Sequence, residues 1–567
     1  MAYYYSKAHI CQCLSRLSTL RRTSVVTISG KRQKTGEQFV DEVLRLANQL
    51  LQLGLRNGEV VAICGFNSEW YLEWLLAVAF VGGIVAPLNY RWNFEEAKSA
   101  FSTINPVMLV ADESCSHWCS LIRSNAIPSL RWHFFLDSSS LGVLKSTKMS
   151  MAEAFGKHIT RSFSLDYSWA PDDAVIICFT SGTTGRPKGV IISHSSLIVQ
   201  SLAKVAIVGY TEDDVYLHTA PLCHIGALSS AMAMLMVGAR HVLIPKFKAT
   251  LVVDSIEQQG VTSFITVPAI LSDLISLTRE NETWAGRQSV KKILNGGGTL
   301  PDELIKDAAK IFPRAKLLSA YGMTETCSSL TFKTLHDPTS EASTHAPVRL
   351  CNGKDNSVYQ PPSGVCVGKP APHVELKISS ESSSQTGRIL TRGPHAMLGY
   401  WDQKIPANAL NSTNEIWLDT GDIGSMDECG SLWLVGRVNG RIKSGGENVH
   451  PEEVEAILLK HPGVIAAVTV GIPDRRLTEK VTACIKLRES WQWTDNSSLA
   501  FAENKQVLCK EILQNFCREK NLTGFKVPKV FILWKKPFPL TSTGKIRRDQ
   551  VRKEAISVLQ SFPSSNL

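Results

Sequence analysis

A short segment rich in glycine and hydroxyl groups, with one lysine, suggests chemistry on phosphates. Residues 180–189 read TSGTTGRPKG and lie between an apolar run, 174–179, and a β-branched run, 190–192. Backbone N–H groups beside glycine can approach an anion closely, hydroxyl groups donate hydrogen bonds, and a lysine supplies charge. The segment therefore predicts a loop that wraps the phosphates of a nucleoside triphosphate. The candidate ligand residues are Thr180, Ser181, Gly182, Thr183, Thr184, Gly185 and Lys188.

The nearest alternative is the Walker A loop, G-x-x-x-x-G-K-[ST]. Lys188 follows Gly185 at the wrong spacing for that loop, and no Ser or Thr follows the lysine. The next segment also reads as a strand, whereas a Walker A loop opens a helix. We therefore expect a strand, a loop and a second strand here.

The elements that must position this loop alternate between helix and strand. Apolar residues from Val40 to Leu51 recur at helical spacing and end at Gly54, and a short buried strand is expected at 60–64. The alternation predicts an α/β fold with layered sheets and helices. Further strands are predicted at 107–111, 174–179, 215–219, 241–243, 263–267 and 292–295.

A change of domain is expected near residue 440. A strand at 432–435 is followed by the string GRVNGR and then by Gly445-Gly446, which suits a hinge. Pro451 then opens a helix with three glutamates in its first turns, where carboxylates favour the helix dipole. We expect an N-terminal domain of residues 1–438 and a C-terminal domain of residues 439–567.

The motifs occur in the same order as in the adenylate-forming enzymes, a superfamily that includes acyl-CoA synthetases, luciferases and peptide-synthetase adenylation domains. The resemblance covers nearly the whole chain. It implies the adenylate-forming enzyme fold, with a large multi-sheet N-terminal domain and a small mobile α+β C-terminal domain. It also implies ATP, Mg²⁺ and coenzyme A as cofactors. The strings that carry it are TSGTTGRPKG, PLCH, GGGT, YGMTE, WLDTGD, GRVNG and PLTSTGKI.

The resemblance assigns roles within the YGMTE string. The tyrosine stacks on adenine, the threonine contacts the α-phosphate, and the glutamate binds Mg²⁺. A buried carboxylate is costly unless it is paired or bound to a metal, which suits the last role. The residues of this string that we expect in the site are Tyr321, Gly322, Thr324 and Glu325.

A glycine run and a histidine are expected around the acyl group. Gly296-Gly297-Gly298 follows a predicted strand, so its bare backbone can let a flat ring lie close. By resemblance this run borders the adenine and the acyl group, and His224 of the string PLCH borders the acyl site. The presumed acyl pocket is modest and partly apolar. It comprises His224, Ala227, Ser229, Thr266 to Ala269, and Gly296 to Gly298.

The remaining residues with a role implied by the resemblance lie toward the C-terminus. By resemblance, Asp422 accepts hydrogen bonds from both ribose hydroxyls and Arg437 completes the nucleotide contacts. Lys545 is the catalytic lysine, whose ammonium group stabilises the negative charge that grows when a carboxylate attacks the α-phosphorus of ATP. Rotation about a hinge at Asn439 then brings a loop containing Gly445-Gly446 to the site, where a thiolate attacks the acyl-adenylate.

The substrate is expected to be a small aromatic carboxylate. Residues 9–17, 294–300 and 436–455 most resemble plant acid–CoA ligases whose aromatic substrate carries a second carboxylate. Such a group needs a cation or several donors, but the helix after His224 has no Lys or Arg before Arg240. Two alternatives stay open: a 4-coumarate-, benzoate- or fatty-acyl-CoA ligase, and an adenylation enzyme that loads a carrier protein.

Composition narrows the choice of partners and location. The net charge of +10 suits anionic substrates, but the basic residues are scattered, so nucleic acid is not expected. The longest apolar stretch, 74–88, is too short to span a bilayer, and we expect a soluble enzyme without an obligate protein partner. The first 36 residues contain no Asp or Glu, and the chain ends in Ser-Asn-Leu. These termini predict a chloroplast or a peroxisome.

Overall fold

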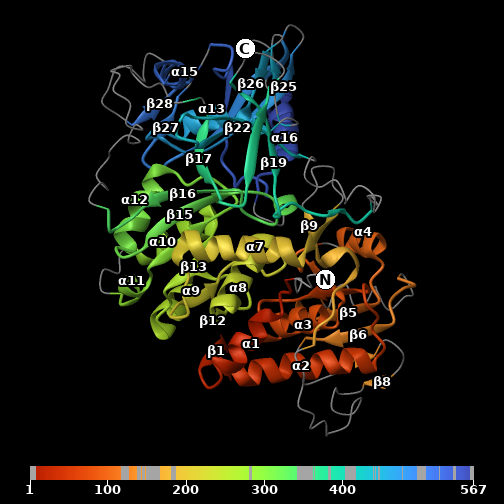
Figure 1. The fold of residues 1–567 in the computed structure, drawn as a ribbon. Coiled ribbons are helices and arrows are strands. Elements are labelled where there is room, and N and C mark those ends of the chain that lie inside the picture. The colour runs from red at the N-terminus through yellow and green to blue at the C-terminus, as the bar shows by residue number, and fades with distance from the viewer. Residues whose placement is uncertain are drawn as a thin grey trace. The chain divides into compact units, whose positions relative to one another are not determined.

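The fold of the chain is seen in a computed structural model (Figure 1), and it divides into two compact units. The first comprises Met1–Pro347, Pro370–Glu375 and Thr391–Leu418, and the second Val348–Lys369, Leu376–Leu390 and Asp419–Leu567. The structure describes residues 8–92, 94–115, 127–136, 142–143, 147–148, 166–180, 187–279, 284–340, 362, 364–380, 385–402, 417–437, 440, 442–444, 447–474, 477–494, 506–520, 522, 524–540 and 545–561.

One sheet of the first unit has the strand order β20-β10-β9-β4-β3-β5-β6. The strands β9, β4, β3, β5 and β6 run parallel, and β10 is antiparallel to β9. The strands β3 and β4 are buried along their whole length, as expected for parallel strands covered on both faces. The bounds are β3 Val60–Cys64, β4 Ile84–Leu88, β5 Met108–Ala111, β6 Trp132–Phe135, β9 Ala174–Thr180, β10 Lys188–Ser193 and β20 Gly399–Tyr400.

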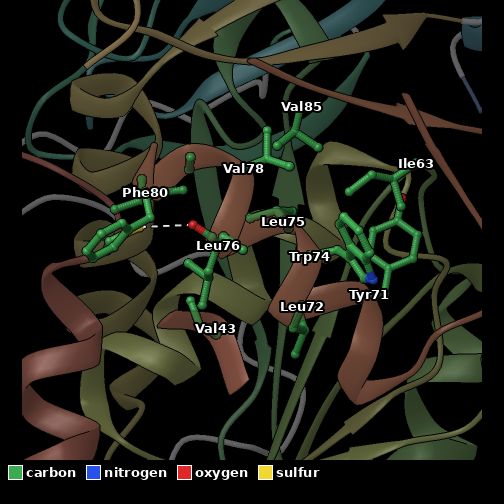
Figure 2. Packing of buried hydrophobic residues seen from close by; sticks show 14 of the residues in the cluster. Val43, Ile63, Tyr71, Leu72, Trp74, Leu75, Leu76, Val78, Phe80 and Val85 are labelled. Carbon is green, nitrogen blue, oxygen red and sulfur yellow. Dashed lines mark hydrogen bonds between the residues drawn. The ribbon is translucent and has the colours of Figure 1, made fainter. Parts of the chain in front are cut away.

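The helix α3 (Glu69–Phe80) packs on this sheet and is buried on every side. It begins after Ser68, whose hydroxyl accepts a hydrogen bond from the N–H of Tyr71. Figure 2 shows its side chains directed toward Val43 of the helix α2 (Gly36–Gln52) and toward Ile63 and Val85 of the sheet. A helix that is apolar all round belongs in a core between two layers, and this one joins α2 to the sheet.

The second sheet of the first unit has the order β16-β15-β14-β13-β11-β12-β1-β2. From β15 to β1 the strands are parallel, so their carboxyl ends meet at one edge. In open α/β sheets that edge is where ligands bind. The bounds are β1 Val25–Ser29, β2 Arg32–Thr35, β11 Val215–His218, β12 Arg240–Leu243, β13 Ser263–Thr266, β14 Lys292–Asn295, β15 Lys316–Tyr321 and β16 Thr331–His336.

Helices surround these sheets, and α7 runs alongside α8 (Figure 1). The other helices of the first unit are α1 Gln12–Thr19, α4 Phe94–Ile104, α7 His194–Lys204, α8 Ile225–Val237, α9 Ala249–Gln259, α10 Pro268–Thr278, α11 Gly286–Ser289 and α12 Asp302–Ile311. Short turns of helix are η1 Glu113–Cys115, η2 Pro171–Asp173, the π-helix η3 Val205–Gly209, and η4 Thr324–Thr326, while β7 Gly142–Val143 pairs with β8 Thr147–Lys148.

The second unit contains strands of two larger sheets, the two-stranded pair of β27 and β28, and a set of helices. One sheet, which lies mostly in this unit, has the order β18-β19-β21-β22-β17, and the other has the order β24-β23-β26-β25 with β29 beside β26. The strand bounds are β17 Val365–Pro370, β18 Glu375–Ser379, β19 Gly387–Arg392, β21 Leu418–Met426, β22 Leu432–Arg437, β23 Ile442–Ser444, β24 Glu447–Val449, β25 Val464–Asp474, β26 Thr478–Leu487, β27 Gln492–Trp493, β28 Val507–Leu508 and β29 Val530–Leu533. The helices are α13 Pro451–Leu458, α15 Lys510–Glu519 and α16 Arg548–Ser561.

Several predicted elements are confirmed. The helix expected at 40–51 is α2, and the strand expected at 292–295 is β14. Pro451 opens α13 at its first turn. The parallel sheets with their helices confirm the α/β class. The boundary between residues 438 and 439 stays a prediction, and Asn439 lies outside the described residues.

Candidate nucleotide and acyl site

The predicted phosphate-binding segment begins at the end of β9 and ends at the start of β10. The strands β9 and β10 pair in antiparallel fashion, and Thr180 lies opposite Lys188 at the end of the ladder next to the connecting segment. This confirms the predicted strand–loop–strand arrangement and excludes a Walker A loop. Lys188 is exposed at the first position of β10. The other predicted phosphate ligands lie outside the described residues: Ser181, Gly182, Thr183, Thr184 and Gly185.

Tyr400 links this hairpin to the predicted metal ligand. The short strand β20 pairs with β10 and places the Tyr400 ring 5.1 Å from the ammonium nitrogen of Lys188. The Tyr400 hydroxyl donates a hydrogen bond of 2.9 Å to Oε1 of Glu325. Burial and the Glu325 carboxylate raise the pKa of Tyr400, so the hydroxyl stays protonated and remains a donor. Tyr400 was not predicted from the sequence, because a Gly-Tyr-Trp string is a weak signal.

The YGMTE string forms a tight turn between β15 and β16. Tyr321 ends β15, and the N–H of Leu330 returns to its carbonyl at 2.7 Å. A Cβ atom at Gly322 would collide with the carbonyl group of Ser328, so this position requires glycine. Cys327 and Ser328 have φ angles of 50° and 109°, which are uncommon for residues with side chains. The strained turn presents Thr324 and Glu325 half-buried on η4.

A buried glutamine holds this turn from the neighbouring helix. Gln200 of α7 is fully buried, and its Nε2 donates to the carbonyl oxygens of Thr326 at 3.0 Å and Ser329 at 2.7 Å. Sequence reasoning missed Gln200, because nothing local distinguishes a glutamine that lies in a core from one in solvent.

The glycine run lies at the carboxyl end of β14, next to the end of β15. The Asn295 side-chain amide donates to the Gly298 carbonyl at 2.7 Å and to the Ser319 hydroxyl of β15 at 3.3 Å. A Cβ atom at Gly296 would meet no described atom within 4 Å, and Gly297 has a φ of +73° that favours glycine. The backbone at Gly296 is open, and a flat ring beside it stays a prediction.

His224 stands immediately before α8 and is half-buried. The loop that leads to it is held by Asn67, which follows β3. The Asn67 Oδ1 accepts from the N–H of Leu222 at 2.9 Å, and its Nδ2 donates to the carbonyl of Ala220 at 3.0 Å. Asn67 is a second positioning residue that local sequence did not indicate.

In the second unit, Asp422 and Arg437 form a cross-strand pair. They lie opposite each other on β21 and β22, with Arg437 Nε 3.0 Å from Asp422 Oδ1. The Asp422 side chain is buried, while that of Arg437 is half exposed. The structure therefore joins the two residues predicted to contact the ribose side of a nucleotide. Gly445 and Gly446 lie outside the described residues.

Lys545 is exposed just before α16. Leu540 and Ile546, which stand on either side of it in the sequence, form an antiparallel β-bridge. Two of the basic residues that follow form separate ion pairs. Arg548 Nη2 lies 3.1 Å from Glu452 and 2.8 Å from Glu455, and Arg552 pairs with Glu479 at 2.7 Å. The cluster is therefore not one uniform solvated basic face.

Comparison with known proteins places the chain in a family. Residues 18–401 match the AMP-binding enzyme family, and residues 453–545 match the AMP-binding enzyme C-terminal domain. The chain belongs to the AMP-binding enzyme family. It is 55% identical to the 2-succinylbenzoate–CoA ligase, chloroplastic/peroxisomal, of Arabidopsis thaliana, over 99% of each chain.

Two solved structures confirm the expected adenylate-forming fold. The anthranilate CoA ligase AuaEII in complex with anthranoyl-AMP has a TM-score of 0.77 at 22% identity, covering 97% of this chain and 98% of that one. The o-succinylbenzoate CoA synthetase of Bacillus subtilis, in complex with its acyl-adenylate intermediate, has a TM-score of 0.71 at 24% identity, covering 95% and 97%.

The Glu325 carboxylate of this AMP-binding enzyme is suited to bind Mg²⁺. Within the described ranges, no group of three or more His, Cys, Asp or Glu side chains could hold a metal. Mg²⁺ keeps several waters and is bound through one or two carboxylates plus substrate phosphates. Glu325 fits this pattern, because only its Oε1 accepts a hydrogen bond from the part of the chain that the structure describes.

Proposed function

We propose that this chain is a 2-succinylbenzoate–CoA ligase. It converts 2-succinylbenzoate, ATP and CoA to 2-succinylbenzoyl-CoA, AMP and diphosphate, through an acyl-adenylate. The observation that carries this proposal is the 55% identity to the Arabidopsis ligase over 99% of both chains. The reaction would serve phylloquinone (vitamin K1) biosynthesis.

In the first half-reaction, the substrate carboxylate attacks the α-phosphorus of ATP and diphosphate leaves. The hairpin with Thr180 and Lys188 holds the phosphates, and Tyr321 stacks on the adenine above Gly296. Bound Mg²⁺ would neutralise phosphate charge, and Glu325 would hold it. Lys545 stabilises the charge that develops in the transition state, a contact of a kind that contributes about 3 kcal/mol.

Asp422 and Arg437 of the second unit bind the nucleotide, and other residues of this unit act in only one of the two half-reactions. Asp422 accepts hydrogen bonds from the ribose hydroxyls, and Arg437 pairs with that carboxylate. In the second half-reaction the CoA thiolate attacks the acyl carbonyl and AMP leaves. We propose that residues 439–567 turn about Asn439 between the two steps, so that the loop with Gly445 and Gly446 replaces Lys545.

The test is product release by the purified protein with MgATP and CoA. The acids are 2-succinylbenzoate, 4-coumarate, benzoate, anthranilate and medium-chain fatty acids. Selective AMP release with 2-succinylbenzoate, dependent on CoA, is the expected result. Preference for one of the monocarboxylates would refute the substrate and keep the ligase class. Adenylation without any CoA-dependent product would favour the loading of a carrier protein.

We also propose that the enzyme acts in the chloroplast, the peroxisome or both. The Arabidopsis relative bears both locations in its name. No helix among the described residues is both long enough and apolar enough to cross a membrane. A fluorescent protein fused after Leu567 should leave the chloroplast signal intact, and one fused before Met1 should leave the peroxisomal signal intact. Cytosolic fluorescence from both fusions would contradict the proposal.

A further inference from the structure

A lysine with no described counter-ion is buried beside the candidate acyl site. Lys204 is the last residue of α7, and its side chain is fully buried. Its Nζ donates to the Ser229 hydroxyl at 2.6 Å, the Ser230 hydroxyl at 3.0 Å and the Gly226 carbonyl at 3.1 Å. All three acceptors are neutral, and no carboxylate among the described residues lies within 4.0 Å.

The acceptors around Lys204 do not depend on its ammonium group. The Ser229 hydroxyl donates to the Ile225 carbonyl at 2.7 Å, and the Ser230 hydroxyl donates to the Gly226 carbonyl at 2.9 Å. Each polar group would therefore keep a partner if an apolar side chain stood at position 204. A buried charge without a partner is expensive, and burial lowers the pKa of Lys204 to about 7. Packing alone gives no reason for a lysine here.

The three acceptors belong to the first two turns of α8, the helix that follows His224. Ser229 was predicted from the sequence to line the acyl pocket. At Gly226, an added Cβ atom would meet only the end of the Ile265 side chain, at 3.8 Å. Ile265 belongs to β13, whose carboxyl end leads into the predicted pocket residues Thr266 to Ala269. Gly226 therefore contacts Lys204 through its carbonyl and approaches Ile265 of β13, next to predicted acyl-pocket residues.

The backbone also departs from regular geometry at this point. The chain continues from Lys204 directly into the π-helix η3 (Val205–Gly209). Single turns of π-helix are rare and are found frequently at functional sites.

Resting on the proposed function, we propose that Lys204 binds the carboxylate of 2-succinylbenzoate that is not adenylated. The helix α8 itself contains no Lys or Arg, so the cation comes from the neighbouring helix α7. The carboxylate would take the place of the Gly226 carbonyl, the most distant acceptor, which keeps the Ser230 hydroxyl as its donor. The Ser229 and Ser230 hydroxyls would go on accepting from the ammonium group while they donate to backbone carbonyls, and so would hold the ammonium group in place.

The test compares Lys204→Met with the wild-type enzyme on matched substrates. These are 2-succinylbenzoate and its two monocarboxylate analogues, 4-oxo-4-phenylbutanoate and 2-butanoylbenzoate. Each analogue lacks one carboxylate, and the one that keeps the reacting carboxylate can still be adenylated. Lys204→Met should lower kcat/KM for 2-succinylbenzoate about 100-fold, because the substrate carboxylate loses its hydrogen bond to a charged group. It should change kcat/KM for the reactive analogue less than threefold.

A matched control is Lys34→Met on β2, which removes a lysine bonded to the buried Glu73 at 2.5 Å. Any effect of this change should be equal for both substrates. If Lys204→Met lowers the rates on 2-succinylbenzoate and the analogue equally, the role of Lys204 is structural and the inference is wrong. If the wild-type enzyme itself prefers a monocarboxylate, the proposed function fails, and the inference falls with it.

A measurement on the wild-type enzyme keeps the inference testable if Lys204→Met does not fold. Because a neutral amine binds a carboxylate weakly, kcat/KM for 2-succinylbenzoate should fall relative to that for the analogue as pH rises above about 7. The thiol of Cys327 faces Lys204, but burial raises its pKa to about 12, so it stays neutral in this range. A ratio of the two kcat/KM values that is constant from pH 6 to pH 9 would overturn the inference.

Discussion

The hydroxyl of Tyr400 donates a hydrogen bond of 2.9 Å to Oε1 of Glu325, although 75 residues separate the two in sequence. The same ring lies 5.1 Å from the ammonium nitrogen of Lys188. One side chain therefore connects the candidate phosphate ligand to the candidate metal ligand. The contact depends on β20, which brings Tyr400 beside β10.

Replacing Tyr400 by phenylalanine should weaken the use of Mg²⁺. The change keeps the ring near Lys188 but removes the donor that orients Glu325. A hydrogen bond to a charged group contributes about 1.5–3 kcal/mol, so kcat for adenylation should fall about tenfold or more. The Mg²⁺ concentration for half-maximal rate should rise. The control is Tyr210→Phe, because the buried Tyr210 hydroxyl has no hydrogen-bond partner among the described residues. An unchanged Mg²⁺ dependence in Tyr400→Phe would show that Tyr400 does not position Glu325.

Gly322→Ala should disrupt the turn that carries Thr324 and Glu325. The new methyl group would collide with the Ser328 carbonyl, so the backbone between β15 and β16 must move. Displacement by about 1 Å near reacting groups can cost about 100-fold in rate. We expect at least a tenfold loss in kcat/KM for ATP. As a control, Gly260→Ala has open space around it and a φ of +61°, so it should lower stability by about 1–2 kcal/mol and leave the activity intact. Equal activity of the two variants would contradict the assignment.

Lys545→Ala should impair adenylation selectively. The rate of acyl-adenylate formation, followed by diphosphate exchange, should fall about 100-fold or more because one preorganised cation is lost. Nucleotide binding measured by calorimetry should change less than threefold, and thioester formation from supplied acyl-adenylate should persist. Lys553→Ala removes an exposed lysine of α16 and provides a control with the same charge change. Equal loss in both half-reactions would count against the assigned role.

Lys204→Met should raise the thermal stability by an amount that depends on pH. Burial lowers the pKa of Lys204 from 10.5 to about 7. Between these values the unfolded chain binds more protons than the folded one, so wild-type stability rises with pH. The advantage of Lys204→Met should be largest below pH 7 and should shrink toward pH 10. Melting temperatures of both proteins at pH 6 and pH 9 test this. An advantage that grows with pH would show that Lys204 is not buried in its charged form.

Local patterns predicted many elements well. The strand at 292–295 matches β14, and the hairpin around Thr180 and Lys188 has the predicted strands on both sides. The reason is that apolar periodicity and glycine-rich turns are short-range properties, which the chain carries in consecutive residues. Asp422 and Arg437 were each predicted in the nucleotide site but not as a pair, and the structure pairs them on two strands that are neighbours in sequence.

The sequence by itself determined the order of the motifs, the identity of the expected nucleotide ligands and the alternation of helix and strand. Only the tertiary structure decided which side chains support them. Gln200 reaches a turn more than 120 residues away, Asn67 holds the loop before His224, and Lys204 enters the space beside α8 from another helix. Such contacts depend on how whole helices and strands pack. Burial, which lowers the pKa of Lys204 to about 7, is a property of the packed core and of no single stretch of chain.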